Sequence, residues 1–247
     1  MKKSVTLYIL LLALSIGVLF LLNLFLGSVD IPFRSIWNIL WGMDEGESVI
    51  WQNIIWKSRV PQALTAMVAG AGLAVSGLQM QTVFRNPLAG PSVLGISSCA
   101  SLGVAFVVLL SGSIGGIALS RLGFMGEIAL TMAAIIGALS IMALIVYVSQ
   151  KVHGNVTLLI IGVMIGYVAN AVIGVLKFFS VEEDIRAYVI WGLGSFARVS
   201  GNQMMVFVCI MAVLLPLSFL LIKTLNLLLL GDAYARNLGL NIKRARL

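Results

Sequence analysis

Charged side chains are scarce in this sequence of 247 residues. Lys, Arg, Asp and Glu together make up 10% of the chain, whereas 60% of it is hydrophobic and the mean hydropathy is +1.08. A soluble domain carries about 25% charged residues, so the composition excludes an ordinary water-soluble domain. The apolar runs are long, and they lack the alternation of barrel strands. The sequence therefore predicts an all-α, polytopic membrane protein.

Residues that ligate metals or carry thiol chemistry are also few. The chain has two cysteines, Cys99 and Cys209, and one histidine, His153. The cysteines lie far apart within apolar runs, which favours small buried side chains over a thiol site. His153 has no partner for a metal site. We therefore expect no metal site and no cofactor bound by this chain.

Two kinds of sequence feature that supply energy for transport are missing as well. There is no GxxxxGK[ST] loop, so we expect that the chain does not bind ATP through that motif. No ionisable residue lies near the middle of an apolar run, where a charge costs upward of about 2.5–3.5 kcal/mol and usually marks a proton or ion relay. This argues against a proton-coupled pump or a voltage sensor. The driving energy then comes from elsewhere, or the protein is a passive pore.

Six apolar segments are predicted to span a bilayer. They cover residues 5–26, 61–84, 93–110, 128–150, 156–179 and 203–222. The first follows Lys2 and Lys3, as in a signal peptide. Its apolar stretch is longer than a signal h-region, however, and no A-x-A cleavage site follows, so we expect a retained helix.

The charges between these segments predict the orientation. With the N-terminus in the cytoplasm, the inner connections hold nine basic residues and one acidic residue, and the outer connections hold seven basic and eight acidic residues. This bias is typical of cytoplasmic loops. We therefore predict a cytoplasmic N-terminus, and we expect no nucleic-acid partner, because topology accounts for the basic excess. The outer connections then contain every tryptophan, as expected of interfacial anchors: Trp37, Trp41, Trp51, Trp56 and Trp191.

Small and polar residues form a stripe along the fifth predicted span. Gly162, Gly166, Asn170 and Gly174 recur at every fourth position and therefore share one helix face. Such faces allow helix backbones to approach closely in lipid. One interpretation is packing against a neighbouring helix, and the other is that Asn170 faces a transport pathway. The two interpretations are compatible if the neighbouring helix that packs on this face also lines the pathway.

Residues 229–247 follow the last apolar run and predict a short surface helix. Gly231 and Asp232 indicate a turn and an N-cap, and Gly239 is typical of a helix end. A spacing of i, i+3, i+7 predicts an amphipathic face made of Ala233, Arg236 and Leu240. From the residues alone, this helix either touches anionic lipid or docks a soluble partner.

Helix-breaking residues separate the second and third predicted spans. Arg85 marks the cytoplasmic boundary, and Asn86-Pro87 stops the helix because the residue before proline is driven out of the α region. Gly90-Pro91 repeats the break, so residues 88–92 are expected to be irregular. Such backbone persists at membrane depth only where protein buries it or water reaches it. It is either a plain cytoplasmic turn or a structured elbow beside the pathway, and in both cases its role is architectural.

Three blocks of the sequence resemble FecCD-type permeases, the membrane subunits of bacterial ATP-binding-cassette importers for iron-siderophores, haem and cobalamin. In order, they are RVPQALTAMVAGAGLAVSGLQMQTVFRNPLAGPSVLGISSCASLG (59–103), IWGLGSFARVS (190–200) and LLGDAYARNLGLNIKRAR (229–246). The resemblance runs along essentially the whole chain. It implies a transmembrane permease domain over residues 1–247, which supplies about six helices of a ten-helix fold and includes a cytoplasmic coupling segment at residues 229–247.

The resemblance also implies roles for individual residues. Residues that couple to the ATPase would be Asp232, Ala233, Arg236, Leu238, Gly239 and Leu240. Arg59 would dock an acidic patch of the substrate-binding protein, with Gln62 where the family often has a second arginine. The cytoplasmic gate and pathway would involve Asn155, Val156, Gly162, Gly166 and Asn170. A structural elbow would comprise Arg85, Asn86, Pro87, Gly90 and Pro91.

The function implied is transport without bond chemistry in this chain, which is therefore expected not to be an enzyme. A permease in the bacterial inner membrane would move an iron chelate (siderophore or haem) or cobalamin, driven by a separate ATPase subunit. The implied partners are that ATPase, a periplasmic or lipid-anchored substrate-binding protein, a second permease copy and membrane lipid.

Alternatives remain open at this level. A gradient-driven secondary transporter, a passive channel fragment and a scaffold fragment without transport are the competing interpretations. Because the family fold has more helices, we expect a partial chain, a truncated product or a chain completed by a second polypeptide. No residue distinguishes between the substrates.

Overall fold

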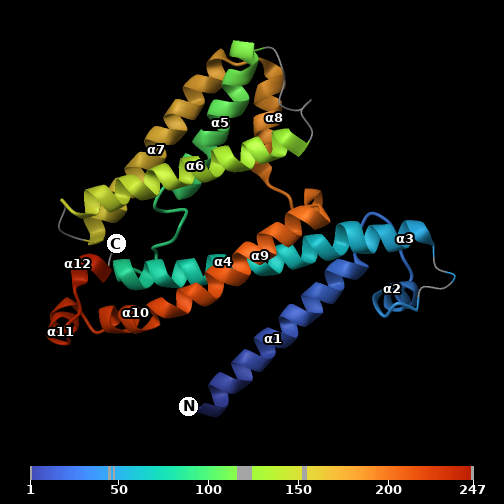
Figure 1. Ribbon diagram of the computed structural model, residues 1–247, viewed down its shortest axis with the longest axis horizontal. Helices are drawn as coiled ribbons and strands as arrows, with labels where there is room; N and C mark the ends of the chain where they lie inside the picture. Colours follow the sequence, from blue (N-terminus) through green and yellow to red (C-terminus); the bar gives the residue numbers. More distant parts are fainter. Residues whose placement is uncertain (1, 44–45, 47, 116–123, 152–154, 246–247) are drawn as a thin grey trace. The chain divides into compact units, whose positions relative to one another are not determined.

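The computed structural model describes residues 2–43, 46, 48–115, 124–151 and 155–245, without the side chains of residues 2–4, 111–115, 124–125, 155, 232 and 243–244. His153 lies outside these residues. The described backbone is helical and contains no strand, which confirms the all-α class. Two compact units are present (Figure 1): Met1–Gly72 with Ser195–Leu215, and Leu73–Gly194 with Pro216–Leu247. We call them unit 1 and unit 2.

Within the described residues, five helices are long and apolar enough to cross a membrane. They are Val5–Phe25, Val49–Phe84, Gly126–Ser149, Val156–Phe179 and Gly201–Leu229, and they correspond to five of the six predicted spans. The third predicted span is α5 (Ile96–Gly115), whose apolar part Ile96–Leu110 is shorter. It begins at Ile96 rather than at residue 93, because Gly95 adopts a φ of +73° that a helix cannot contain. A cytoplasmic N-terminus stays a prediction.

Unit 1 contains a small helical cap between its first two long helices. After α1 (Lys2–Phe25), the chain forms α2 (Phe33–Leu40), α3 (Val49–Ile54) and a π-helical turn, η1 (Ile55–Arg59), before α4 (Val60–Phe84) begins. Ile36 and Ile39 of α2 pack against Ile55 in a buried cluster. The apolar i, i+3 pair on α2 explains this packing, since both side chains lie on one helix face.

The helical run Val49–Phe84 is longer than a bilayer requires. Its 36 residues extend about 54 Å at 1.5 Å per residue, compared with a hydrocarbon core of about 30 Å. Part of this run therefore lies beyond the hydrocarbon. Trp51 and Trp56, which were predicted in an outer connection, lie on this helical extension.

Unit 2 is built around α5, α6 (Phe124–Ser149), α7 (Asn155–Phe179) and α8 (Glu182–Leu193). The backbones of α5 and α6 meet at glycines: a Cβ on Gly103 would overlap the carbonyl oxygen of Ala133, and a Cβ on Gly137 would overlap that of Cys99. Close approach through small residues is the packing expected in lipid, where dispersion contacts drive helix association. The sequence analysis did not identify this pair of glycines.

The last helical run carries the chain to its C-terminal segment. It comprises α9 (Gly201–Ser218), the 3₁₀ turn η4 (Phe219–Leu221) and α10 (Ile222–Leu229), followed by α11 (Asp232–Asn237) and α12 (Ile242–Ala245). The predicted end at residue 222 is too early, because the lysine that follows does not stop a helix. Cys99 is buried as expected, but Cys209 is exposed, since α9 has no buried residue.

Candidate functional site

The segment after α10 is a capped helix joined to a second short helix. Gly231 precedes α11 with a φ of +106°, and Gly239 follows it with a φ of +85°. The Leu240 N–H donates to the Ala235 carbonyl at 2.9 Å, and the Gly239 N–H donates to the Arg236 carbonyl at 3.0 Å. These two bonds define a Schellman motif, which needs a left-handed residue after the helix. The predicted helix end at Gly239 is confirmed.

The exposed surface of α11 is both apolar and basic. Tyr234 is 68% exposed and Leu238 is 61% exposed, while Ala235 is fully buried and fixes the helix orientation. Arg236 and Ala233 are exposed as predicted, whereas Leu240 lies after the helix and is half-buried. The side chain of Asp232 is not described. The sequence analysis missed Tyr234, although its i, i+4 spacing with Leu238 places both on one face.

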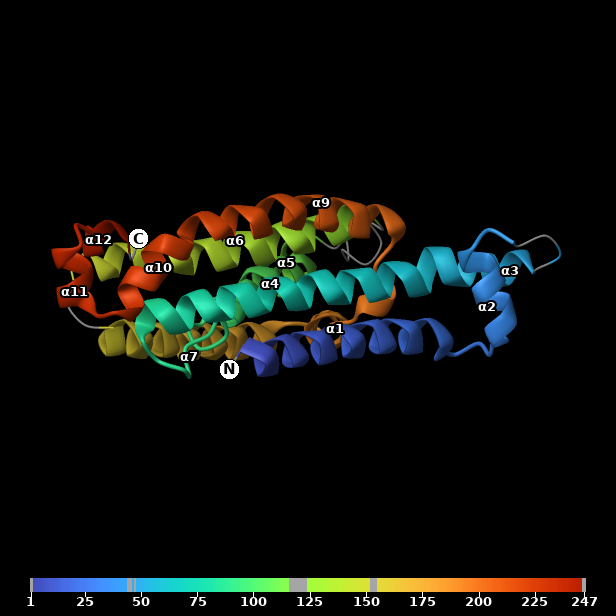
Figure 2. The same cartoon turned by 90° about the horizontal axis from the view of Figure 1, so that it is seen from below.

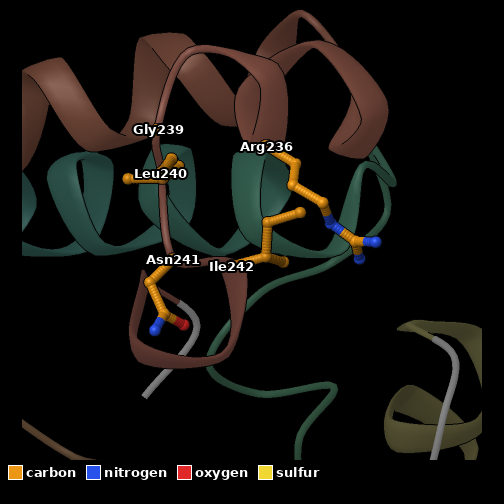
Figure 3. Close-up of a pocket in the computed structure, with 5 residues that line it drawn as sticks. All are labelled: Arg236, Gly239, Leu240, Asn241 and Ile242. Carbon is orange, nitrogen blue, oxygen red and sulfur yellow. The ribbon is translucent and has the colours of Figure 1, made fainter.

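A cavity of about 380 Å³ opens beside this segment. As Figure 3 shows, Arg236 of α11 borders it together with residues of the following turn and the start of α12; its lining is Arg236, Gly239, Leu240, Asn241 and Ile242. A guanidinium beside apolar surface and a short connection can receive an acidic or amphipathic segment of another protein. The arrangement offers a docking surface and holds no group that could perform bond chemistry.

Arg85 connects the end of α4 to the end of α10. Its Nε and Nη2 donate to the Leu228 carbonyl at 3.2 and 2.9 Å. This carbonyl also accepts from the Gly231 N–H at 3.2 Å. It lies at the negative end of the helix dipole, where a cation is stabilising. Leu228 lies three residues before Gly231, and the bond therefore joins α4 to the start of the C-terminal segment.

The backbone at Arg85 is itself unusual. Arg85 has a φ of +49°, the only positive φ of a non-glycine residue in the described chain. The Asn86 N–H donates to the Gln81 carbonyl at 3.1 Å, so Arg85 occupies the left-handed position that closes α4. A residue with a side chain is sterically strained at such a position. The hydrogen bonds from Arg85 to the Leu228 carbonyl offset part of this strain.

The connection that follows is ordered by its own polar groups. The Asn86 Oδ1 accepts from the Leu88 N–H at 2.9 Å, and the Gln81 Nε2 donates to the Pro87 carbonyl at 3.0 Å. The first bond is an Asx turn, which asparagine forms readily before proline. Further on, the Val93 N–H donates to the Gly90 carbonyl across Pro91 at 3.1 Å. We call residues 85–95 the elbow.

The elbow packs against the small-residue stripe of α7. A Cβ on Gly162 would lie 3.0 Å from the Leu94 Cα, and a Cβ on Gly95 would lie 3.1 Å from the Gly166 nitrogen. Leu94 is 2% exposed. The backbone of the elbow thus touches the backbone of α7, and a larger residue at either glycine would separate them.

Asn170 of the same stripe contacts the start of α5, just after the elbow, whereas Gly174 makes no close contact. The Asn170 Nδ2 donates to the Ser98 Oγ at 3.4 Å, whereas Gly174 has no neighbour within 4 Å of a built Cβ. A cavity of about 190 Å³ lies beside the contact, lined by Ser92, Val93, Gly95, Ser98, Val163, Gly166, Tyr167 and Asn170. Its polar groups are neutral amides and hydroxyls. They can exchange hydrogen bonds with a passing solute without the cost of a buried charge.

The remaining pathway and docking predictions have different outcomes. Asn155 begins α7, but its side chain is not described, and Val156 is 66% exposed. Arg59 was expected on the surface and is instead 5% exposed. Its guanidinium donates to the carbonyls of Leu24 at 2.5 Å, Phe25 at 3.2 Å and Val29. Carbonyls at and after the end of α1 thus hold the guanidinium inside unit 1. Docking of the substrate-binding protein by Arg59 stays a prediction.

The geometry defines a class of protein. It is a polytopic α-helical membrane protein with a capped, exposed segment after its last long helix. Its described part contains no cluster of three or more His, Cys, Asp or Glu that could hold a metal. Residues 12–247 match the FecCD transport family. The chain belongs to this family.

Two curated relatives show how far the similarity extends. The chain is 35% identical over 223 residues to the hemin transport system permease protein HmuU of Yersinia pestis, covering 90% of this chain and 63% of the relative. It is 35% identical over 236 residues to the vitamin B12 import system permease protein BtuC of Serratia proteamaculans, covering 95% and 64%. The chain thus spans somewhat less than two thirds of these relatives.

The fold has a solved counterpart. A transporter assigned to the metal-chelate type of ABC transporter, in an inward-facing conformation, superposes with a TM-score of 0.73 at 28% identity. The similarity covers 95% of this chain and 68% of that one. The arrangement of helices is therefore that of an ABC transporter membrane subunit.

Proposed function

We propose that this chain provides membrane-spanning permease helices of an ATP-binding-cassette importer in the bacterial inner membrane. The cargo is an iron chelate, such as a siderophore complex or haem, or cobalamin. Hydrolysis of ATP takes place on a separate subunit, so the chain binds no cofactor and is not an enzyme. The relatives are permeases of haemin and vitamin B12 transport, which favours this function over a gradient-driven transporter or a passive channel.

The observation that carries this proposal is the exposed face of α11. Two large apolar side chains and a cation are exposed there: Tyr234, Leu238 and Arg236. Apolar residues with arginine are typical of the centre of a protein–protein interface, and their exposure marks a docking site. The partner is the ATPase subunit, whose docking surface must be acidic opposite Arg236.

A continuous path of contacts within unit 2 leads from this face to α7. Movement of α11 displaces the end of α10, where Leu228 accepts the hydrogen bonds of Arg85. Arg85 begins the elbow, and the elbow touches Gly162 and Gly166 through backbone atoms. Because packed interfaces shift between discrete arrangements, a small displacement at α11 is transmitted to the helix that lines the pathway.

The exposed side of α7 supports a pairing of two permease copies. Tyr167 is 68% exposed and Asn170 is also exposed on a helix that spans the membrane. Polar groups facing lipid are costly, and they are satisfied when a second copy or a water-filled pathway covers them. A substrate-binding protein delivers the cargo from the other side.

The docking of the ATPase is tested by charge reversal. Arg236→Glu is expected to reduce ATPase co-purification and transport by about tenfold each, because the new charge repels an acidic partner surface. Lys151→Glu is the matched control, an exposed lysine outside the C-terminal segment that is expected to leave both unchanged. Normal co-purification of the ATPase with Arg236→Glu would show that α11 is not its docking site.

The energy source is tested separately in vesicles. The importer is reconstituted with a form of its ATPase that binds but does not hydrolyse ATP. Uptake of the cargo is expected to stop. Continued uptake driven by an ion gradient would support the secondary transporter instead.

A further inference from the structure

The helix α2 has a buried apolar face and an exposed face, and the exposed face is unexpectedly rich in aromatic side chains. Its buried face comprises Ser35, Ile36 and Ile39, which pack toward the cap. The opposite face carries Phe33, Trp37 and Trp41, which are 64%, 45% and 64% exposed. A surface helix in water normally presents charged residues on that side. Three large aromatic side chains in a row need a non-aqueous neighbour.

These aromatic rings form a ladder that begins on α1. The rings of Phe25 and Phe33 stack with centroids 4.8 Å apart, those of Phe33 and Trp37 lie 6.3 Å apart, and those of Trp37 and Trp41 lie 5.8 Å apart. Phe25 is the last residue of the span Val5–Phe25, whose most apolar part has no buried residue. The ladder therefore joins the end of this span to the exposed face of α2, and Phe25 itself is half-buried against the cap.

The position and direction of α2 match the edge of the bilayer. Phe25 ends the apolar part of α1, so the ladder starts where hydrocarbon gives way to the headgroups. Figure 2 shows α2 running steeply across the direction of α1, as a helix in the membrane plane would beside a spanning helix. Tryptophan favours this zone because its ring is apolar while its N–H requires a polar partner.

We propose that α2 is an interfacial anchor that lies in the plane of the membrane, with Phe33, Trp37 and Trp41 inserted between lipid headgroups and acyl chains. The occupant of the aromatic face is the phospholipid interface, and Arg34 beside the ladder is placed to meet lipid phosphates. The anchor fixes the depth of the cap, because Ile36 and Ile39 hold the helix against Ile55. It thereby fixes the level of the η1 turn that carries Arg59.

The proposal is tested with nitroxide labels in phospholipid bilayers. Cys99 and Cys209 are replaced by serine, and single cysteines are introduced at positions 33, 37 and 41, one at a time so that two rings of the ladder remain. Leu14, 65% exposed on α1, provides the lipid-facing reference, and Glu182, exposed at the start of α8 outside the spanning helices, provides the water-facing one. Collision rates are measured with oxygen, which partitions into lipid, and with a water-soluble nickel chelate.

The expected result is a ratio of oxygen to nickel collisions at positions 37 and 41 several-fold above that at position 182 and approaching that at position 14. A ratio equal to that at position 182 would overturn the proposal, because the ladder would then face water or await a soluble partner. If a labelled variant fails to fold, quenching by lipids brominated near the headgroup provides the second measurement. The wild-type chain should lose more tryptophan fluorescence than Trp37→Phe/Trp41→Phe, and equal quenching would also overturn the proposal.

Discussion

The two ends of α4 carry arginines that make the same kind of bond with opposite accessibility. Arg59, just before the helix, donates to carbonyls at and after the end of α1, and Arg85, just after it, donates to a carbonyl at the end of α10. Both place a cation at the negative end of a helix dipole. Arg59 is buried, however, whereas Arg85 is exposed.

This difference separates a structural role from a mechanical one. Three carbonyl contacts and the close fit of Gly27, where a Cβ would lie 2.9 Å from the Arg59 Cζ, leave the Arg59 guanidinium one position. The Arg85 guanidinium donates to the Leu228 carbonyl from an exposed position with a strained backbone. A buried arginine like Arg59 stabilises its unit. An exposed arginine like Arg85 can transmit or release a movement at a low cost in free energy.

The largest effect is expected from Arg85→Ala on transport. Hydrogen bonds from a charged donor contribute about 1.5–3 kcal/mol, so their loss is expected to lower transport by about tenfold or more, while ATPase co-purification stays normal because α11 is intact. Arg85→Gly is the matched control, since it removes the side chain and also relieves the strain of the positive φ. Equal losses in both variants assign the effect to the side chain. Recovery in the glycine variant would assign it to the backbone instead.

Arg59→Ala is expected to have the largest effect on stability. Three carbonyls lose a charged donor, and a loss of about 2–3 kcal/mol lowers the melting temperature of a protein of this size by about 5–10 °C. Thermal unfolding in detergent measures this. Arg34→Ala, an exposed arginine of α2, should change the melting temperature by less than about 2 °C. An equal effect of the two variants would remove the distinction between Arg59 and an ordinary surface arginine.

The contact between the elbow and α7 is tested by adding one methyl group. Gly162→Ala places a Cβ 3.0 Å from the Leu94 Cα, and crowding of this kind costs about 1–3 kcal/mol. Both the melting temperature and transport should fall. Gly174→Ala, with no neighbour within 4 Å, should be neutral or slightly stabilising. If the two variants behave alike, the backbone contact does not hold the elbow.

The smallest expected effect concerns Asp184 of α8, outside the spanning helices. Its side chain is 8% exposed, and its Oδ2 has no hydrogen-bond partner. Burial raises the pKa of its carboxyl above the ordinary value of 3.8, and the charge of Glu183 raises this pKa further. The folded state therefore binds the proton more tightly, so stability is greatest below the unfolded pKa and falls as the pH rises through the folded pKa.

Asp184→Asn should consequently raise the melting temperature at pH 7.5, by about 2–4 °C for each kcal/mol gained. The gain should disappear below the ordinary pKa of 3.8, where the wild-type carboxyl is protonated in both states. Glu183→Gln, which removes an exposed charge, should show a weaker dependence on pH. A gain with Asp184→Asn that is independent of pH would exclude ionisation as its cause.

Features set by local chemistry could be predicted from the sequence. Hydropathy located the spans, Asn86-Pro87 located the end of α4, and Gly239 located the end of α11, because each depends on a few neighbouring residues. The stripe of α7 was also predictable as a packing face, except that Gly174 has no neighbour. These features include most of the backbone of the candidate site.

Contacts between distant segments could not be predicted. Arg59 bonds to carbonyls about 30–35 residues away and Arg85 to one 143 residues away, and a backbone carbonyl leaves no residue type as a signal. For the same reason, the sequence does not distinguish an arginine that will be buried from one that docks a partner. The glycines Gly103 and Gly137 were missed because each is isolated in its own helix and the pair exists only in the fold.

The central claim is that the elbow and the end of α10 move as one body when the ATPase acts. It is tested most directly by the distance between spin labels at Leu88 and Leu230, which are 78% and 60% exposed. The importer is assembled with excess unlabelled chain, so that only distances within one chain are observed. The distance should be the same without nucleotide and with ATP bound, and it should broaden or shift in Arg85→Ala. A change in the wild-type protein as large as that in Arg85→Ala would contradict the account.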